Sequence, residues 1–236
     1  MLKRSRMFLP AWMFRKPKKL YKYISAEGAK DFFQDPALWF RLPNRLNDIF
    51  DINPVGSNRV DFGGVAVFCL SETPTSAPMW AHYGSKGEGV VLEFALQSDF
   101  FWKYPPVKVC YQSKRPTLKN FEKSLMTKDV AWSYEREWRC VTDISFDEYR
   151  EQSFLQKHQA VSVPFPFDAL TAVIHGYDSQ VDVDAFLARP EASHVSELVI
   201  RPDAWRYDLK VCSLDNIDHL FDKRDAYDWG RRQLAR

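Results

Sequence analysis

The irregular spacing of short apolar runs constrains the fold of this chain more than any other feature of its sequence. Alternating or apolar runs predict strands at residues 20–25, 37–43, 64–71, 89–94, 107–111, 134–141, 172–176, 197–201 and 209–214. Short helices are predicted at residues 26–35, 79–84, 117–127 and 181–188. Because the helices do not alternate regularly with the strands, the sequence predicts an α+β fold with a curved, mostly antiparallel (mixed) β-sheet core and short flanking helices.

Composition favours one domain with extra segments at both ends. The chain has 236 residues, of which 45% are hydrophobic and 27% charged, which is typical of a globular protein. No internal repeat or Gly/Ser linker divides it, so we expect a single domain at residues 20–214. A basic arm (residues 1–19) and a helical or flexible tail (residues 215–236) complete the predicted organisation.

The basic arm leaves two interpretations open. The first 23 residues carry eight Lys or Arg side chains and no acid. In the first, the apolar run of the arm docks on its own domain. In the second, the arm contacts nucleic acid or a partner protein. The run MFLPAWMF is too short to cross a bilayer, which takes about 20 residues, and no small-residue cleavage site follows it. A cytoplasmic protein without a transmembrane segment is expected.

The four cysteines indicate reduced thiols. Cys69, Cys110, Cys140 and Cys212 are far apart, each within an apolar or β-type run. The sequence contains no C-x-x-C, and no His lies at zinc-ligand spacing from a Cys. We therefore expect four mostly buried free thiols, as in cytoplasmic proteins, and no metal.

Carboxylates and an arginine gather in residues 134–141. If this run is a strand, Glu135, Glu137 and Arg139 share one face, with about 7 Å between the two glutamates. An adjacent Arg favours the ionised form of a carboxylate. Such a pair suits the stabilisation of a positive charge, such as the oxocarbenium ion formed when a glycosidic bond breaks. The same residues would also suit an exposed strand face with cross-strand ion pairs.

Aromatic and basic residues could complete a ligand site. Trp80, Tyr83 and Tyr23 offer faces on which a heterocycle could stack. Lys22 or His82 could hold a phosphate or a ribose hydroxyl. A purely structural alternative stays open, because aromatic residues three positions apart on a helix are often core and His82 could simply be hydrogen-bonded.

Several short segments resemble a widespread bacterial family, the domain of unknown function 2971 (DUF2971). LYKY, LNDIFD, FCLSE, MWAHYGSKGEGVVLEF, VKVCY, WSYEREWR and AVIHG occur in the family's order, over roughly residues 20–211. The most specific are MW-HY with the apolar run after it, and YE-EWR. Ile49 stands where the family's Asn-Asp-Pro-Phe turn has proline, while Asn47, Asp48, Phe50 and Asp51 match.

The layout is also similar to the ADP-ribosyltransferase superfamily, which transfers ADP-ribose from NAD. That resemblance places Lys22 or Tyr23 at the residue that grips NAD, although a His or Arg is usual there. It places Ser71, Trp80, His82 and Tyr83 in the middle element, and Glu135-x-Glu137 at the catalytic element. It implies NAD as substrate, no metal, and a role as a bacterial toxin or antiphage defence effector.

Two functions therefore remain. In the first, the protein is an enzyme that cleaves NAD and transfers ADP-ribose to a protein or nucleic-acid acceptor. Glu137 would stabilise the ribosyl cation, Glu135 would orient or deprotonate the acceptor, and Arg139 and Lys22 would hold phosphates. In the second, the same cleft binds a nucleotide or nucleic acid without chemistry, and the basic arm supplies affinity.

Overall fold

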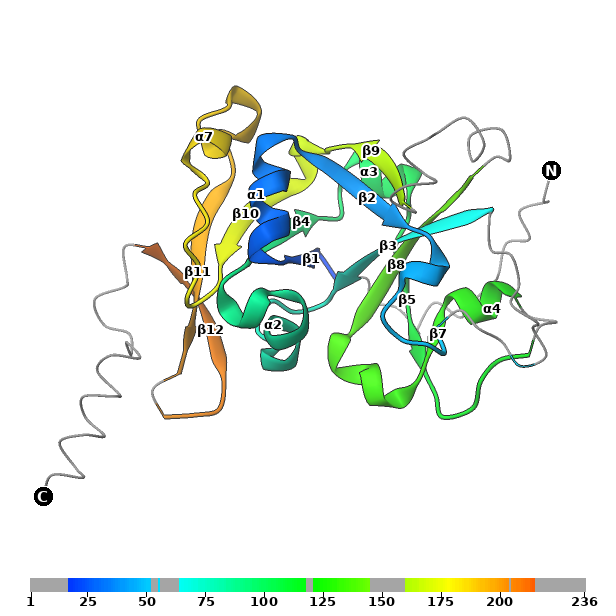
Figure 1. The fold of residues 1–236 in the computed structure, drawn as a ribbon. Helices are drawn as coiled ribbons and strands as arrows, with labels where there is room; N and C mark the ends of the chain where they lie inside the picture. Colours follow the sequence, from blue (N-terminus) through cyan, green and yellow to red (C-terminus); the bar gives the residue numbers. More distant parts are fainter. Residues whose placement is uncertain are drawn as a thin grey trace, which may run out of the picture.

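The computed structural model describes residues 17–51, 55, 64–117, 121–144, 160–203 and 205–214 (Figure 1). The larger sheet contains β1 (Lys19–Ile24), β2 (Ala37–Arg41), β3 (Val65–Ser71), β4 (Val90–Ala95), β5 (Val107–Lys108), β8 (Glu137–Asp143), β9 (Ala160–Pro164), β10 (Leu170–His175), β11 (Ser196–Pro202) and β12 (Leu209–Ser213). A smaller sheet pairs β6 (Cys110–Tyr111) with β7 (Thr127–Lys128). The helices are α1 (Ala26–Gln34), α2 (Ala77–Tyr83), α3 (Asp99–Lys103), α4 (Phe121–Leu125) and α7 (Asp184–Leu187). Short 3-10 helices are η2 (Pro43–Arg45), η3 (Ser85–Gly87), η5 (Val130–Glu135), η6 (Phe167–Ala169) and η7 (Pro190–Ala192).

The larger sheet is mixed and mostly antiparallel, as predicted. Its main path runs β12-β11-β10-β4-β1-β3-β2-β9, and β8 joins β3 to β5. Within it, only β10 and β11 are parallel among the described strands. The α/β content with a mostly antiparallel sheet confirms the predicted fold class at this level.

Two apolar clusters cover the two faces of the sheet. On one face, α1 contributes Phe32 and Phe33, α3 contributes Phe100 and α7 contributes Phe186. On the other face, Trp80 of α2 packs against the sheet residues of a second cluster. The side chain of Ser25 caps α1 by accepting a hydrogen bond from the N–H of Gly28, which satisfies one free donor of the first turn. Figure 1 shows α1 and α2 as separate layers beside the central strands.

The two edges of β3 are paired differently. One edge pairs with β8 along all seven residues, from Val65↔Asp143 to Ser71↔Glu137. On the remaining edge, β1 pairs only at Tyr21↔Ser71, and β2 pairs only at Arg41↔Val67. Between these two points β1 and β2 diverge from β3, so a stretch of its edge lies open.

Three sequence predictions of local structure are wrong. Residues 107–111 form two strands in different sheets, because the N–H of Val109 donates to Glu137 while that of Cys110 donates to Met126. The helix predicted at residues 117–127 does not begin at Thr117, which forms an isolated bridge with Val55, and α4 begins later. β9, which pairs with β2, was not predicted.

The run at 134–141 is also not one strand. Residues up to Glu135 belong to η5, whose first turn is capped by the carboxylate of Asp129. Arg136 then takes a left-handed conformation (φ 46°, ψ 48°), and β8 begins at Glu137. The expected sharing of a strand face therefore holds for Glu137 and Arg139 alone.

The structure also tests the predictions made for the chain ends, the cysteines and membrane-spanning helices. Residues 1–16 and 215–236 lie outside the described residues, and Lys19 of the predicted arm begins β1 and pairs with Glu93. All four cysteines are free, as expected, but the prediction that they are mostly buried is wrong, because Cys140 is buried, Cys69 and Cys212 are partly exposed and Cys110 is exposed. In the described part of the chain no helix has the length and apolar character that a bilayer span requires.

Packing between two glycine turns provides a stability test. A Cβ at Gly176 would lie 2.1 Å from the carbonyl oxygen of Gly87, whose own φ is +99°. Gly176→Ala should therefore lower the free energy of unfolding by about 1–3 kcal/mol, since backbone must move to admit the methyl group. Urea unfolding monitored by circular dichroism measures the change. Gly64→Ala is the control, because nothing lies within 4 Å of its Cβ; equal effects of the two variants would contradict the packing argument.

Candidate functional site

A two-lobed cleft occupies the space where β1 and β2 diverge from β3. The first lobe, here called the carboxylate lobe, has a volume of about 180 Å³ and is lined by Glu135, Glu137, Tyr83 and Lys128 as well as by residues of the three strands. The second, the helix lobe, has a volume of about 550 Å³ and reaches α1. The residues common to both linings are Lys22, Tyr23, Trp39 and Arg41. The two lobes therefore adjoin at these side chains.

Both glutamates open onto the carboxylate lobe although only one lies on a strand. Glu137 is the first residue of β8, and Glu135 ends η5. The left-handed turn at Arg136 brings both carboxylates to the same lobe. Each side chain is about 5% exposed, so the pair is accessible to a ligand only from within the cleft.

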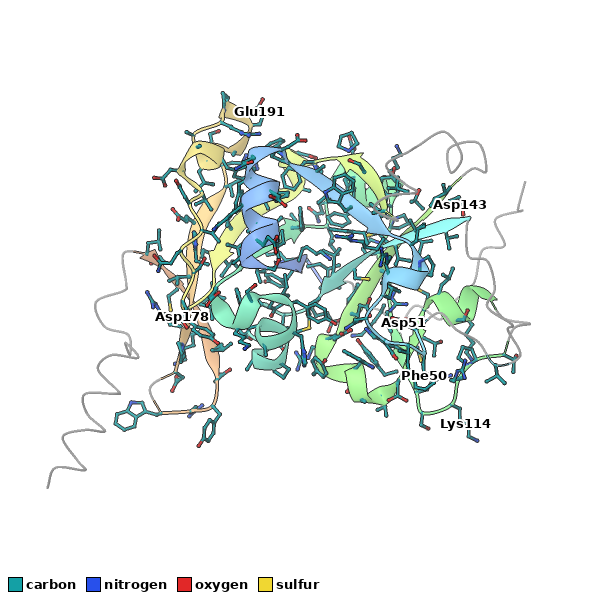
Figure 2. All side chains as sticks on the ribbon, in the orientation of Figure 1. Phe50, Asp51, Lys114, Asp143, Asp178 and Glu191 are labelled. Carbon is teal, nitrogen blue, oxygen red and sulfur yellow. The ribbon has the colours of Figure 1, made fainter. Side chains whose placement is uncertain are left out.

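Arg139 is a structural residue rather than a phosphate ligand. Its guanidinium is fully buried and donates to the Asp51 carboxylate at 2.6 and 2.9 Å and to the Glu137 carboxylate at 2.8 and 3.0 Å. A further bond of 2.9 Å goes to the carbonyl oxygen of Leu125. Asp51, labelled in Figure 2, comes from the turn after η2. The predicted role of Arg139 in holding phosphates is wrong, because no part of the guanidinium faces the cleft.

Lys128 links the two carboxylates and is a residue that the sequence did not reveal. Its ammonium lies 2.6 Å from Glu135, 3.4 Å from Glu137 and 3.7 Å from Asp51. It also lies 4.7 Å from the ring centroid of Trp132. The sequence contains a signal for Asp51, which lies in the turn that resembles the DUF2971 pattern. It contains none for Lys128, whose neighbours in sequence are typical of a surface lysine.

The environments of the two glutamates shift their pKa values in opposite directions. Burial by itself would raise the pKa of Glu137, but the charges of Arg139 and Lys128 outweigh it and hold that pKa at about 2. Burial raises the pKa of Glu135, and the charge of Lys128 offsets this only in part. A pair of carboxyl groups whose environments separate their pKa values can divide the roles of charge and proton carrier.

Tyr83 fixes the orientation of Glu135. Its hydroxyl donates to the Glu135 carboxylate at 2.5 Å and accepts a hydrogen bond from the side-chain amide of Asn47. Burial and the neighbouring Glu135 charge raise the pKa of Tyr83, so the phenol stays protonated and remains a donor. Tyr83 is half-buried and lines the carboxylate lobe, in agreement with its predicted place in the site.

Two aromatic residues expected to contact the ligand are packed in the core. Trp80 is 1% exposed, donates to the carbonyl oxygen of Pro74 and meets Tyr23 edge to face at 5.2 Å. Tyr23 lines the cleft, but it is 6% exposed and its hydroxyl donates to Thr73. The prediction that Trp80 stacks a ligand is wrong, because both faces of its indole serve packing.

Ser71 and His82 have other roles as well. Ser71 lines the carboxylate lobe, but its buried hydroxyl donates to the carbonyl oxygen of Glu135 at 2.7 Å, so it holds η5 against β3. His82 is exposed, lies over the ring of Tyr134 at 6.0 Å and is absent from both linings. The predicted contact of His82 with a ligand is therefore not supported by its position.

Cations at the mouth of the cleft come from β1, β2 and η2. Lys22 and Arg41 line both lobes, and Arg45 lines the carboxylate lobe. Arg41 and Arg45 are exposed, and no described carboxylate pairs with either. The sequence did not single out these two arginines. Their exposed guanidinium groups could bind the phosphates of a ligand, the role that was predicted for Arg139.

Comparisons with family models, curated proteins and solved structures find no match to this chain. Among the described residues, no group of three His, Cys, Asp or Glu side chains is arranged to hold a metal ion.

Replacing each glutamate by glutamine should affect stability differently. Glu137→Gln should lower the free energy of unfolding at pH 7 by about 3 kcal/mol, because it leaves Arg139 with one carboxylate partner. Glu135→Gln should also lower it, but by less, about 1 kcal/mol, since burial disfavours the charge that it removes and Lys128 keeps Glu137 at 3.4 Å and Asp51 at 3.7 Å. Urea titrations at pH 7 measure both effects.

The pH dependence gives the sign of the Glu137 contribution. Its folded pKa of about 2 lies below its ordinary value of 4.5, so its stabilisation is fully present above about pH 4.5 and is lost as the pH falls toward 2. The difference between wild type and Glu137→Gln should shrink over that interval. A difference that stays constant with pH, or an equal loss in both variants at pH 7, would contradict this assignment.

Proposed function

We propose that this protein is a nucleotide-binding enzyme of ADP-ribosyltransferase type, related to the DUF2971 family, which cleaves or transfers across the N-glycosidic bond of NAD. The observation that carries the proposal is the arrangement of the cleft. An ionised carboxylate and a second carboxyl group, whose pKa burial raises, share one lobe, and cations lie where that lobe meets the other. The DUF2971 and ADP-ribosyltransferase resemblances agree with this chemistry and supply the substrate class.

The two lobes match the two halves of a dinucleotide. Arg41 and Arg45 would hold the diphosphate, with Lys22 between the lobes. The half to be cleaved would enter the carboxylate lobe. Tyr21 and Trp39, both half-buried and lining that lobe, offer aromatic surface in place of Trp80.

The carboxylates would divide the chemistry between them. Glu137, which stays ionised, would stabilise the positive charge that develops on the ribose as nicotinamide leaves. Glu135, whose pKa is raised, would take the proton of the acceptor nucleophile. Tyr83 would keep that carboxylate in place through its hydrogen bond. A protein or nucleic-acid acceptor, a cytoplasmic location and a role as a toxin or antiphage effector complete the proposal.

A binding module without chemistry is the second candidate function. It is favoured by the ion pairs of Glu137 with Arg139 and Lys128, which reduce the negative charge that a reacting ribose would meet. In this case the cleft holds a nucleotide or a nucleic-acid end, and the basic arm increases affinity. Binding would then weaken steeply with salt, and deletion of residues 1–16 would remove much of that dependence.

Nicotinamide release from NAD by the purified protein tests the enzyme. Glu137→Gln should lower the rate by about 10²–10³ while nucleotide still binds, because it removes a preorganised electrostatic partner of the transition state. Glu135→Gln should reduce transfer to an acceptor in cell extract and spare NAD hydrolysis. Chromatography of nicotinamide and labelling by radioactive NAD measure the two reactions.

Glu93→Gln is the matched control. Glu93 is a buried glutamate on β4 that pairs with Lys19, and it lies outside both lobes. It should leave the rate of nicotinamide release unchanged at a temperature where circular dichroism shows every variant folded. If Glu137→Gln retains full activity, or the wild type binds NAD without releasing nicotinamide, the binding module is the better function.

A further inference from the structure

The side chain of Lys22 on β1 reaches the open section of the β3 edge. Its ammonium nitrogen donates to the carbonyl oxygen of Cys69 at 3.1 Å, in the stretch of β3 that neither β1 nor β2 pairs. It also lies 5.1 Å from the ring centroid of Phe68. Because Lys22 lines both lobes, a small molecule in either one can reach it.

No carboxylate in the described part of the chain pairs directly with Lys22. Lys19, Lys108 and Lys128 each have a carboxylate at 2.5 or 2.6 Å. Around Lys22 the nearby acids are already engaged, Glu137 with Arg139 and Glu135 with Lys128. The amine therefore lies in a cleft without the counter-charge that normally keeps a buried lysine protonated.

The surrounding groups shift the pKa of this amine in both directions, and burial has the largest effect. Burial lowers the pKa of Lys22, and the positive charge of Arg41 on β2 lowers it further. Cys69 on β3, Glu137 on β8 and Glu135 at the end of η5 act in the opposite sense, more weakly than burial. Asp31 and Asp35 of α1 also line the helix lobe, and no ion pair joins either to Lys22.

We propose that Lys22 is a nucleophilic amine that forms an imine with a small anionic aldehyde held in the cleft. The geometry gives each partner a place: Lys22 between the lobes, and Arg41 and Arg45 at the mouth to hold a phosphate or carboxylate of the ligand. A desolvated lysine in such a site is an activated nucleophile toward carbonyl carbon. This reactivity is independent of NAD cleavage.

The step balances without any oxidant or reductant. The amine lone pair attacks the aldehyde carbon, a C–N bond forms, and the C=O π electrons move to oxygen, which takes up the proton released by nitrogen. The nitrogen lone pair then expels that oxygen as water, and the products are an imine and one water molecule. Glu135, which opens onto the same lobe as Lys22, is placed to supply and recover the proton that leaves with the water.

Labelling with pyridoxal 5′-phosphate, a phosphorylated aldehyde, tests the proposal on the full-length protein. The imine is reduced with added borohydride, and peptide mass spectrometry locates the modified lysines. At pH 7 Lys22 should be modified at least about tenfold faster than Lys30, an exposed lysine of α1, because each unit by which a pKa is lowered raises the neutral fraction about tenfold. The rate should also reach half its maximum at a lower pH for Lys22 than for Lys30.

Variants separate nucleophile, charge and anion recognition. Lys22→Arg and Lys22→Met should both abolish the fast adduct, whereas Lys30→Met should retain it. Unphosphorylated pyridoxal should react more slowly than the phosphate at Lys22, and Arg41→Gln should reduce that preference. Melting curves confirm that each variant is folded.

Three results would overturn the inference. The first is modification of Lys22 and Lys30 at equal rates, and the second is a fast adduct that persists in Lys22→Arg. The third is an equal rate with pyridoxal and its phosphate, which would remove the anionic ligand from the proposal. Failure of NAD cleavage with a fast Lys22 adduct would leave this inference standing, because the adduct is measured with another ligand and does not require Glu137.

Discussion

The structure depends on the sharing of one β3 edge by two strands. A strand edge can satisfy one continuous neighbour, and here β1 and β2 each pair with β3 at a single position while β8 occupies the whole of the other edge. The backbone groups left between these points need other partners, and the side chain of Lys22 supplies one to Cys69. The cleft, its two lobes and its exposed cations all follow from this divergence.

A buried charge cluster stabilises the other side of the same region. Arg139 and Lys128 face Asp51, Glu135 and Glu137, so three carboxylates share two cations. Such clusters contribute little net stability compared with apolar packing, but removal of one member is costly. The cluster joins the turn after η2, the small sheet and β8, and so it fixes where the walls of the carboxylate lobe lie.

Charge states within the cleft explain how a compact site could perform chemistry. Glu137 and Arg139 are in environments that favour their charged forms, whereas burial disfavours the charges of Glu135 and Lys22. Groups such as Glu135 and Lys22 are those that can exchange protons or attack an electrophile near neutral pH. Glu137 and Arg139 keep their charges and so provide a constant electrostatic background. Both proposals for this protein use that division, with Glu137 as the central residue of one and Lys22 as that of the other.

The sequence by itself predicted most of the strands and the mostly antiparallel sheet, and it selected the two glutamates that line one lobe. Apolar runs predicted β3, β4 and β10 because burial selects such residues wherever a strand is covered on both faces, whereas alternation predicted β1. Only the tertiary structure decided what the polar side chains do. An aromatic residue on a short helix, such as Trp80, shows the same sequence pattern whether it stacks on a ligand or packs in the core. Likewise, the sequence around Arg139 does not reveal whether its guanidinium binds a ligand or Asp51.

Long-range contacts account for the remaining differences. Alternation extended the predicted strand through Arg136, but the cap of η5 and the hydrogen bond from Ser71 to Glu135 impose a left-handed turn there. Lys128, Arg41 and Arg45 join the site through pairings between segments far apart in the chain, which leave no local periodicity. Periodicity reports which face of an element is buried, whereas the partner of a buried charge is set by how the elements meet in space.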